Sequence, residues 1–173
     1  MRLLLDRYPS PVGHLLLVHD EEGLLRGLDF GDYEERMHRL LRRHYGETRL
    51  EQAPAPAPVR AALEAYFGGD YRALDVVRTA TGGTDFQRAV WAQLRLIPPG
   101  ETLSYGALAA RVGSPQASRA VGLANGSNPI AIVVPCHRVI GANGTLTGFG
   151  GGLPRKKWLL EHERALERRD LFS

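Results

Sequence analysis

The sequence predicts an α+β chain whose strand-rich N-terminal part is followed by a mostly helical C-terminal part. Short apolar runs alternate with turn residues over the first thirty positions, as in strands joined by tight turns. In several later segments the apolar residues recur at helical spacing instead. Paired glycines at 82 and 83 suit a joint between the two parts. We therefore expect one domain over residues 1–80 and a second over 81–173.

The N-terminal part is expected to contain three strands and two helices. Apolar runs at 3–8, 15–19 and 24–30 predict the strands, with turns at 9–13 and 21–23. Apolar residues at 37, 40, 41 and 45 predict a helix over 33–45 that stops at Gly46. The alternating Ala-Pro segment 53–58 predicts a stiff, extended linker, and a short helix over 59–67 follows it. Residues 76–81 are a candidate for one more strand.

Three helices are expected next, the last two forming a helix-turn-helix. Thr84 and Gln87 match a capping box for a helix with apolar residues at 86, 90 and 94, ended by 98–100. Ser104 can cap a short helix that stops at Gly113. Ser114 can cap the next, over 116–125, with a proline at its first position. Two short helices joined by a glycine-containing turn are typical of a helix-turn-helix.

The second helix of this pair has an unusual composition for a reader of DNA sequence. Recognition helices in the major groove carry long polar side chains that reach base edges. Residues 116–124 are instead mostly small, with the single arginine Arg119. Small side chains would let the helix lie close to the walls of a narrow groove. Tight packing between helices explains the same residues equally well.

Charge is unevenly distributed along the 173 residues, whose net charge is +3. Residues 1–83 hold 11 arginines against 13 acidic residues, whereas 85–157 hold 8 basic residues against 2 acidic ones. A basic second half indicates a polyanionic partner for it. No apolar run has the length of a membrane span, and the first residues do not form a signal peptide, so we expect a cytoplasmic protein with no membrane partner.

The only cysteine, Cys136, follows the apolar, β-branched run 130–134, which we expect to be buried. A single cysteine excludes an intramolecular disulfide and a cysteine-rich zinc site. Most lone cysteines are inert core residues, and that interpretation competes with a reactive one. A reactive cysteine needs a thiolate, which a neighbouring base and a cation favour. His137 and Arg138 supply both types of neighbour.

The segment Pro135-Cys136-His137-Arg138-Val139 resembles the active-site motif of the O6-alkylguanine-DNA alkyltransferases. The resemblance covers roughly residues 84–165 and includes, in the family's order, segments 86–91, 99–105, 118–122, 128–129, 148–153 and 157–163. It implies that Cys136 takes an alkyl group from guanine O6 and is consumed by doing so, with O4-alkylthymine as a second substrate. It also implies a ribonuclease H-like fold for the N-terminal α/β domain.

The resemblance assigns roles to the residues around Cys136. His137 would act as a base through a water, oriented by Glu163, in the logic of nucleophile, base and orienter. The hydroxyl of Tyr105 would donate to the purine, and Asn128 would be the hinge between the helix-turn-helix and the active-site strand. The base edge would be held by the backbone around three residues: Cys136, Val139 and Gly150. We expect Arg138 to brace buried carbonyls or the domain interface rather than to take part in the chemistry.

The implied partner is double-stranded DNA with alkylated bases, bound through its minor groove. The target atom lies inside a duplex, so the base must leave the stack, and Arg119 resembles the family's finger residue that fills the gap. The small-residue helix then becomes a minor-groove helix. The remaining DNA-binding residues implied are Ser104, Ser118, Ala120 and Gly122. We expect a monomer that needs no cofactor and no metal.

Two other functions remain open from the sequence. A non-enzymatic protein that binds alkyl lesions would share the fold, but family relatives of that kind lack the cysteine. A thiol hydrolase using Cys136 and His137 would turn over many times and would need no DNA. The stoichiometry of alkyl transfer separates these functions from self-alkylating repair.

Overall fold

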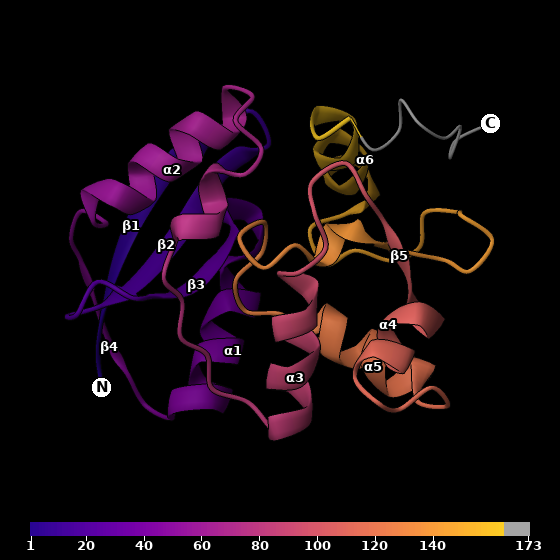
Figure 1. The fold of residues 1–173 in the computed structure, drawn as a ribbon. Coiled ribbons are helices and arrows are strands. Elements are labelled where there is room, and N and C mark those ends of the chain that lie inside the picture. The colour runs from indigo at the N-terminus through magenta and orange to yellow at the C-terminus, as the bar shows by residue number, and fades with distance from the viewer. Residues whose placement is uncertain (165–173) are drawn as a thin grey trace. The chain divides into compact units, whose positions relative to one another are not determined.

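The structure is a computed structural model that describes residues 1–164. These residues divide into two compact units (Figure 1). The first unit contains residues 1–83 together with 129–133, and the second contains 84–128 and the described residues from 134 onward. The segment 129–133 therefore returns to the first unit from the middle of the second. Whether 1–80 and 81–173 fold as separate domains stays a prediction.

The first unit is built on a four-stranded sheet of order β3-β2-β1-β4. Strand β1 pairs antiparallel with β2 and parallel with β4, and β2 pairs antiparallel with β3. The three predicted strands are present, and the edge strand β4 was missed because it is a short polar segment without an apolar run. The strands are β1 (Arg2–Ser10), β2 (Gly13–Asp20), β3 (Leu25–Phe30) and β4 (Arg49–Gln52).

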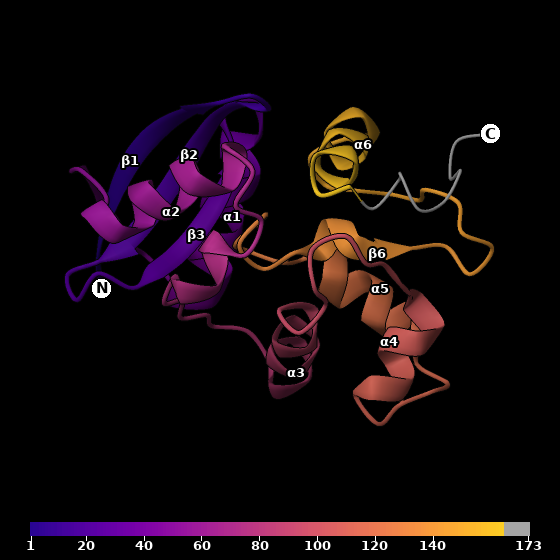
Figure 2. The same ribbon diagram turned by 45° about the horizontal axis from the view of Figure 1, so that its top comes forward.

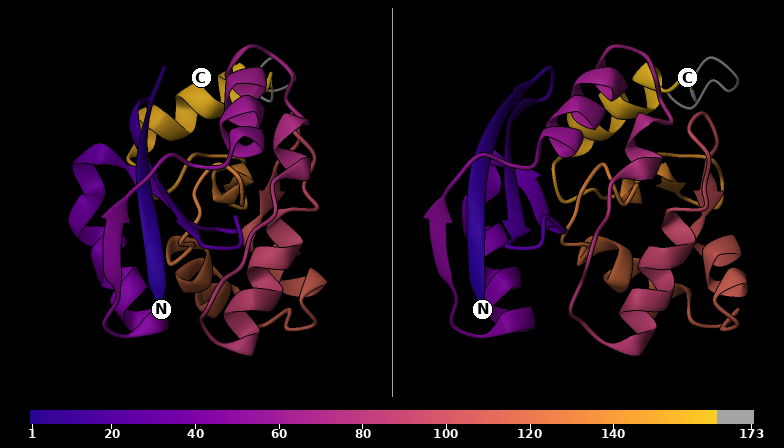
Figure 3. Two further views of the ribbon diagram at one scale, coloured as in Figure 1. Left: turned by 90° about the vertical axis from the view of Figure 1, so that its left-hand side faces the viewer. Right: turned by 60° about the vertical axis from the view of Figure 1, so that its left-hand side comes forward.

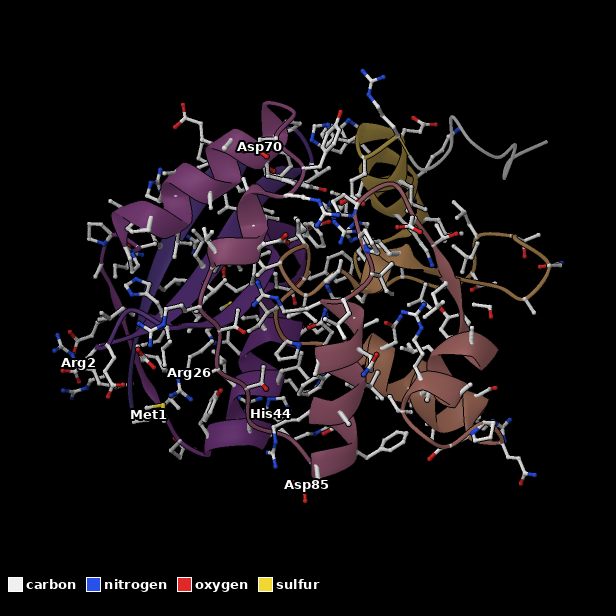
Figure 4. The ribbon with its side chains drawn as sticks, viewed as in Figure 1. Met1, Arg2, Arg26, His44, Asp70 and Asp85 are labelled. Carbon is white, nitrogen blue, oxygen red and sulfur yellow. The ribbon has the colours of Figure 1, made fainter. Side chains whose placement is uncertain are left out.

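Two helices cover the sheet, α1 (Glu34–Tyr45) on one side and α2 (Ala57–Phe67) on the other (Figure 3). A short 3₁₀ turn, Gly31–Tyr33, precedes α1. Because side chains alternate along a strand, one face of β1 and β2 meets α1 in a core of Leu3, Leu5, Leu16, Val18, Met37 and Leu41. Helix α2 begins inside the predicted linker, since Pro58 fits a first helical turn. His44 lies near the end of α1 (Figure 4).

The predicted strand over 76–81 is wrong. A 3₁₀ turn, Ala73–Val76, occupies its start. Only Thr79 then pairs with the sheet, in an isolated bridge to Leu25. The backbone N–H of Leu25 donates to the carbonyl of Arg78 at 3.0 Å, and the N–H of Ala80 donates to the carbonyl of Leu25 at 3.0 Å.

The second unit is mostly helical, with one small two-stranded sheet (Figure 2). Thr84 and Gln87 form the predicted capping box, in which Thr84 Oγ1 accepts from Gln87 N at 3.1 Å and Gln87 Oε1 from Thr84 N at 3.0 Å. Asp85 follows at the start of α3 (Figure 4), and its exposed carboxylate pairs with Arg88 on the next turn of the helix. The elements are α3 (Asp85–Leu94), α4 (Tyr105–Arg111), α5 (Ser118–Gly126), α6 (Leu153–His162) and the parallel strands β5 (Leu103–Ser104) and β6 (Val139–Ile140).

The helix-turn-helix is present as α4 and α5, which pack against each other. Ser104 caps α4 as predicted, accepting from Ala107 N at 3.1 Å. The cap predicted at Ser114 is wrong, because α5 begins only at Ser118 and has no side-chain cap. Residues 114–117 form a separate turn, closed by a bond of 2.8 Å from Ala117 N to Ser114 O. Proline in the second position favours such a turn over an earlier helix start.

The apolar run 130–134 is buried, as predicted, but it is not a strand. It touches the sheet only at its start, where Leu28 N donates to Pro129 O at 2.9 Å and Ala131 N donates to Leu28 O at 3.0 Å. Ile132 then has φ +70°, a left-handed conformation that is rare for a β-branched residue and breaks the extended path. The element implied as an active-site strand is therefore a tight loop. No described helix has the length and apolarity needed to cross a membrane.

Candidate active site

Cys136 begins a single 3₁₀ turn, Cys136–Arg138, that leads directly into β6. Its side chain is buried, with 7% of the residue exposed. Two backbone bonds shape the turn: Cys136 N donates to Val134 O at 2.8 Å, and Arg138 N donates to Pro135 O at 3.0 Å. The loop before the turn and the strand after it thus hold the only thiol of the chain at a defined place in the interior of the second unit.

A buried charge network lies next to this thiol. His137 is fully buried, and its Nε2 lies 2.8 Å from Oε2 of Glu163, which follows α6. Arg138 donates to both oxygens of the same carboxylate, from Nε at 2.8 Å and from Nη2 at 3.0 Å. Its Nη1 donates to the carbonyl of Ile97 at 2.6 Å. Arg138 therefore clamps Glu163 and braces a buried carbonyl, in keeping with the role expected for it.

The surroundings of Glu163 and His137 set the protonation state of each side chain. Burial alone would raise the pKa of Glu163, but the charges and hydrogen bonds of His137 and Arg138 outweigh it and hold that pKa well below its usual range. Burial lowers the pKa of His137. A neutral His137 beside a carboxylate carries its proton on Nε2 and donates it to Glu163. Its Nδ1 is then a free base with no hydrogen-bond partner among the described residues.

Lys156 on α6 is a further buried cation that the sequence analysis missed. Its Nζ donates to the carbonyl of Val139 at 2.6 Å and to that of Thr147 at 2.8 Å. Burial lowers the pKa of Lys156 to about 8, and the charge of a Cys136 thiolate acts in the opposite direction. A signal was present, because residues 156, 159, 160 and 163 share the buried face of this helical segment. A lysine on that face has to be satisfied by specific partners.

The predicted substrate-facing residues lie on elements next to the Cys136 turn. Tyr105 is the first residue of α4, directly after its cap Ser104, and its hydroxyl accepts from Thr147 Oγ1 at 3.4 Å. Val139 is buried on β6 and pairs with Leu103 on β5. Gly150 is exposed, in a turn before α6. The pairing of β5 with β6 and the Ser104 cap thus place Tyr105 beside the strand that leads out of the Cys136 turn.

The end of α5 is tied to the loop that carries Cys136. Asn128 Nδ2 donates to the carbonyl of Val134 at 2.7 Å, which is the connection expected of a hinge. One turn earlier, Asn125 Nδ2 donates to the carbonyl of Cys136 itself at 3.4 Å. Trp91 on α3 fixes the same helix end, because its Nε1 donates to Ala124 O at 2.8 Å. The contact of Asn125 with Cys136 had no counterpart among the predicted site residues.

Helix α5 has a buried side that packs against the rest of the unit and an exposed side. Val121 and Ala124 are buried, which agrees with helix packing. A Cβ at Gly122 would lie 3.8 Å from the Tyr105 ring, an ordinary contact distance, so this part of α5 lies beside that ring. The exposed side presents the residues predicted to face DNA, Ser118, Arg119 and Ala120, together with Leu123.

None of the described residues form a group of three or more His, Cys, Asp or Glu side chains that could hold a metal. The Cys136 turn brings several reactive side chains together. They comprise a thiol, a neutral imidazole held by an anionic carboxylate, and two buried cations. In protein chemistry this is the equipment of an activated nucleophile.

Comparison with known proteins gives consistent matches over both units. Residues 85–165 match the family model described as "6-O-methylguanine DNA methyltransferase, DNA binding domain", and residues 4–80 match its "ribonuclease-like domain". A methylated-DNA–protein-cysteine methyltransferase of Salmonella typhimurium is 52% identical over 165 residues, covering 94% of this chain and 96% of that protein. The protein of that name from Methanosarcina acetivorans is 47% identical over 156 residues, covering 90% and 95%. The crystal structure of Mycobacterium tuberculosis OGT in complex with DNA matches with a TM-score of 0.77 and 42% identity, covering 95% of this chain and 94% of that one.

Proposed function

The chain belongs to the 6-O-methylguanine DNA methyltransferase family, and we propose that its Cys136 is the residue that accepts the alkyl group. The function is DNA repair by direct reversal, in which the alkyl group of O6-alkylguanine moves to a protein cysteine. The observation that carries the assignment to Cys136 is the buried network beside it, in which His137 contacts Glu163 at 2.8 Å. An inert core cysteine would have no need of such neighbours.

The transfer is a displacement at a saturated carbon, for which a thiolate is a suitable soft nucleophile. His137 takes the thiol proton through a water molecule, using Nδ1, and Glu163 stabilises the imidazolium that forms. The leaving guanine gains negative charge, so it needs donors nearby. Tyr105 supplies a hydroxyl, and the base edge lies against backbone near Val139 and Gly150. Residues of this one chain supply every role, so the protein acts as a monomer and without a cofactor.

The reaction is stoichiometric rather than catalytic in the usual sense. A thioether is chemically stable, and none of the described residues near Cys136 is suited to cleave it. O4-alkylthymine presents the same type of leaving group and is a second substrate. The single free cysteine suits a reducing compartment, which supports a cytoplasmic location.

The DNA partner binds at the exposed side of α5. The Mycobacterium tuberculosis relative was crystallised with DNA, which supports a DNA-bound state for this chain. Small side chains at Ser118 and Ala120 let the helix approach the minor groove, and Gly122 lies beside the Tyr105 ring. Arg119 enters the space that the extruded base leaves. Ser104 holds the N-terminus of the neighbouring helix α4 in place.

The proposed function is tested by mixing the protein with excess duplex that carries one O6-methylguanine per molecule. We expect at most one lesion removed per protein, and Cys136→Ala should remove none while still binding the duplex. Continued turnover with excess duplex would instead indicate a hydrolase. Binding of the duplex without any removal would indicate a lesion-binding protein.

The finger role of Arg119 is tested by comparing two substrates. Arg119→Ala should slow repair of the duplex lesion at least tenfold while leaving transfer from the free base O6-benzylguanine nearly unchanged, because only the duplex requires extrusion of the base. Rates are measured from single-turnover time courses. An equal loss on both substrates would exclude the finger role for Arg119.

A further inference from the structure

The side chain of Asn125 is a buried amide whose two polar atoms have different surroundings. It lies on the buried side of α5, with 6% of the residue exposed. Its Nδ2 faces the carbonyl of Cys136 at 3.4 Å. Because a carbonyl only accepts, the amide must turn its NH₂ toward Cys136 and its oxygen away. Oδ1 then lies in the interior with no hydrogen-bond partner among the described residues.

A second unpartnered acceptor belongs to the residue next in the chain to Cys136. His137 Nδ1 is buried and has no partner in the described part of the chain. Because Nε2 carries the ring proton and donates it to Glu163, Nδ1 is unprotonated and offers a lone pair. Asn125 and His137 therefore each place a buried, unpartnered acceptor beside the turn that Cys136 begins. Buried polar atoms in folded proteins are nearly always satisfied by protein or by ordered water.

We propose that one buried water donates its two hydrogens to Asn125 Oδ1 and His137 Nδ1, and that Asn125 is a positioning residue for proton transfer from Cys136. Two acceptors cannot bond to each other, whereas a water has the two donors that they need. The water oxygen then keeps its lone pairs for the thiol S–H. This inference rests on the proposed function for the identity of the nucleophile, and it adds the residue that holds the water in place.

The proton balance of the step is simple. The S–H bond of Cys136 breaks, and its proton goes to the water oxygen. The same water passes its own hydrogen to His137 Nδ1, so that a thiolate and an imidazolium replace a thiol and an imidazole. The hydrogen bond to Asn125 Oδ1 is unchanged throughout, which keeps the water oriented for both transfers. No oxidant or further reactant is required.

The charges around this water suit the transfer. Glu163 contacts the imidazole from the segment after α6 and favours the imidazolium. Arg138 contacts the same carboxylate at 2.8 Å, and Lys156 on α6 brings a cation whose charge interacts with the thiolate. Asn125 is neutral and adds no charge of its own. Its contribution is therefore geometric, and it should be visible as a change in the pH at which the thiol becomes reactive.

The test uses the unmodified full-length protein, iodoacetamide as the probe, and no DNA. The rate of Cys136 alkylation is measured by mass spectrometry from pH 5.5 to 10 for the wild type and for Asn125→Leu, which has a similar volume but no acceptor. We expect the variant to react about tenfold more slowly at pH 7, with its midpoint shifted up by about one pH unit. The two rates should converge near pH 10, where the thiolate forms without assistance.

Asn128→Ala is the matched control, because it removes a carbonyl bond of the same helix end to the same loop. It should change the rate by a similar factor at every pH, without moving the midpoint. Asn125→Ala is the second variant if Asn125→Leu does not fold, and circular dichroism checks both. An unshifted midpoint in a folded Asn125 variant would overturn the inference and leave Asn125 as a structural tie alone.

This experiment is independent of methyl transfer. A shifted midpoint in a protein that removes no methyl group from DNA would sustain the water site and refute the proposed function. Normal stoichiometric repair with an unshifted midpoint would support the proposed function and refute the water site.

Discussion

The two units of this protein bury polar groups in different ways. In the first unit the buried carboxylates are Asp20, at the end of β2, and Asp29, on the edge strand β3, and both are paired with arginines whose side chains are partly exposed. In the second unit the side chains of His137 and Glu163 are both fully inaccessible. The first unit therefore leaves one partner of each pair in contact with water, whereas the second removes a whole charge network from it.

This difference indicates where the chemistry lies. A buried ion pair adds little stability compared with a well-packed apolar pair, because removing both charges from water is unfavourable. A protein that keeps one next to its only cysteine is therefore expected to use it. The sheet unit has an ordinary apolar core on α1, and the arginines of its buried charge pairs keep some contact with water. The comparison predicts that disrupting charges has different consequences in the two units.

The largest expected effect is on stability when the clamp on Glu163 is removed. Arg138→Met leaves the carboxylate of Glu163 buried without the guanidinium that contacts both of its oxygens, and breaking a buried pair in this way costs about 3–5 kcal/mol. The matched variant in the first unit is Arg7→Met, whose partner Glu34 lies 3.2 Å away at the surface. Exposed pairs of that kind contribute about 0–1 kcal/mol. Urea denaturation followed by circular dichroism measures both, and equal losses would remove the distinction between the units.

A smaller effect is expected on the pH dependence of stability. Burial lowers the pKa of His137 below its ordinary 6.5, so the unfolded chain binds a proton that the folded protein does not. Stability should therefore fall as pH drops below about 6.5, by up to about 1.4 kcal/mol per pH unit for this one proton. His137→Gln should flatten that slope in urea titrations between pH 7 and 5.

Two other groups affect the interpretation of this slope. The lowered pKa of Glu163 also makes the protein less stable in acid, but only as pH falls below its ordinary value of 4.5. His44, in the first unit, has its pKa lowered by burial and then by the charge of Arg43, although its ring is only half buried. His44→Gln should therefore flatten the slope less than His137→Gln, and the opposite order would contradict the comparison.

The smallest expected effect concerns two helix starts within the second unit. Thr84→Ala removes a capping box and should cost about 1 kcal/mol. Ser114→Ala should change stability by less than about 0.5 kcal/mol, because Ser114 contributes its backbone carbonyl to a turn and caps no helix. Both tryptophans, Trp91 and Trp158, belong to the second unit, so fluorescence reports its unfolding directly. A loss of 1 kcal/mol in both variants would restore the predicted cap.

Local signals in the sequence were sufficient for much of the fold. The Thr84–Gln87 box and the apolar spacing of α1 depend on neighbours within one helical turn, and both were predicted. The helix cap predicted at Ser114 was wrong because a serine followed by a proline is typical both of a helix start and of a turn. The apolar run before Cys136 has the composition of a strand, but Ile132 has a left-handed backbone conformation, and the run is therefore a loop. Amino-acid composition does not indicate the backbone conformation of a single residue.

The candidate site was predictable where a motif runs along the chain and not where partners are distant. Cys136 and His137 are adjacent in sequence, and Glu163 was assigned to the site through the resemblance to the alkyltransferase family. Lys156 and Asn125 were missed because their importance depends on carbonyls that only folding brings close, those of Val139 and Cys136. Each is a polar residue on the buried face of its helix. That pattern is visible in a sequence once the helix boundaries are known.

The most direct test of the central claim is the site of alkylation. After incubation with an O6-methylguanine duplex, trypsin should release residues 120–138, which contain the only cysteine, from cleavage after Arg119 and Arg138. We expect this peptide to carry one methyl group on Cys136, in an amount equal to the lesions removed. Removal of lesions with an unmodified Cys136 peptide, or with methyl on another residue, would contradict the account.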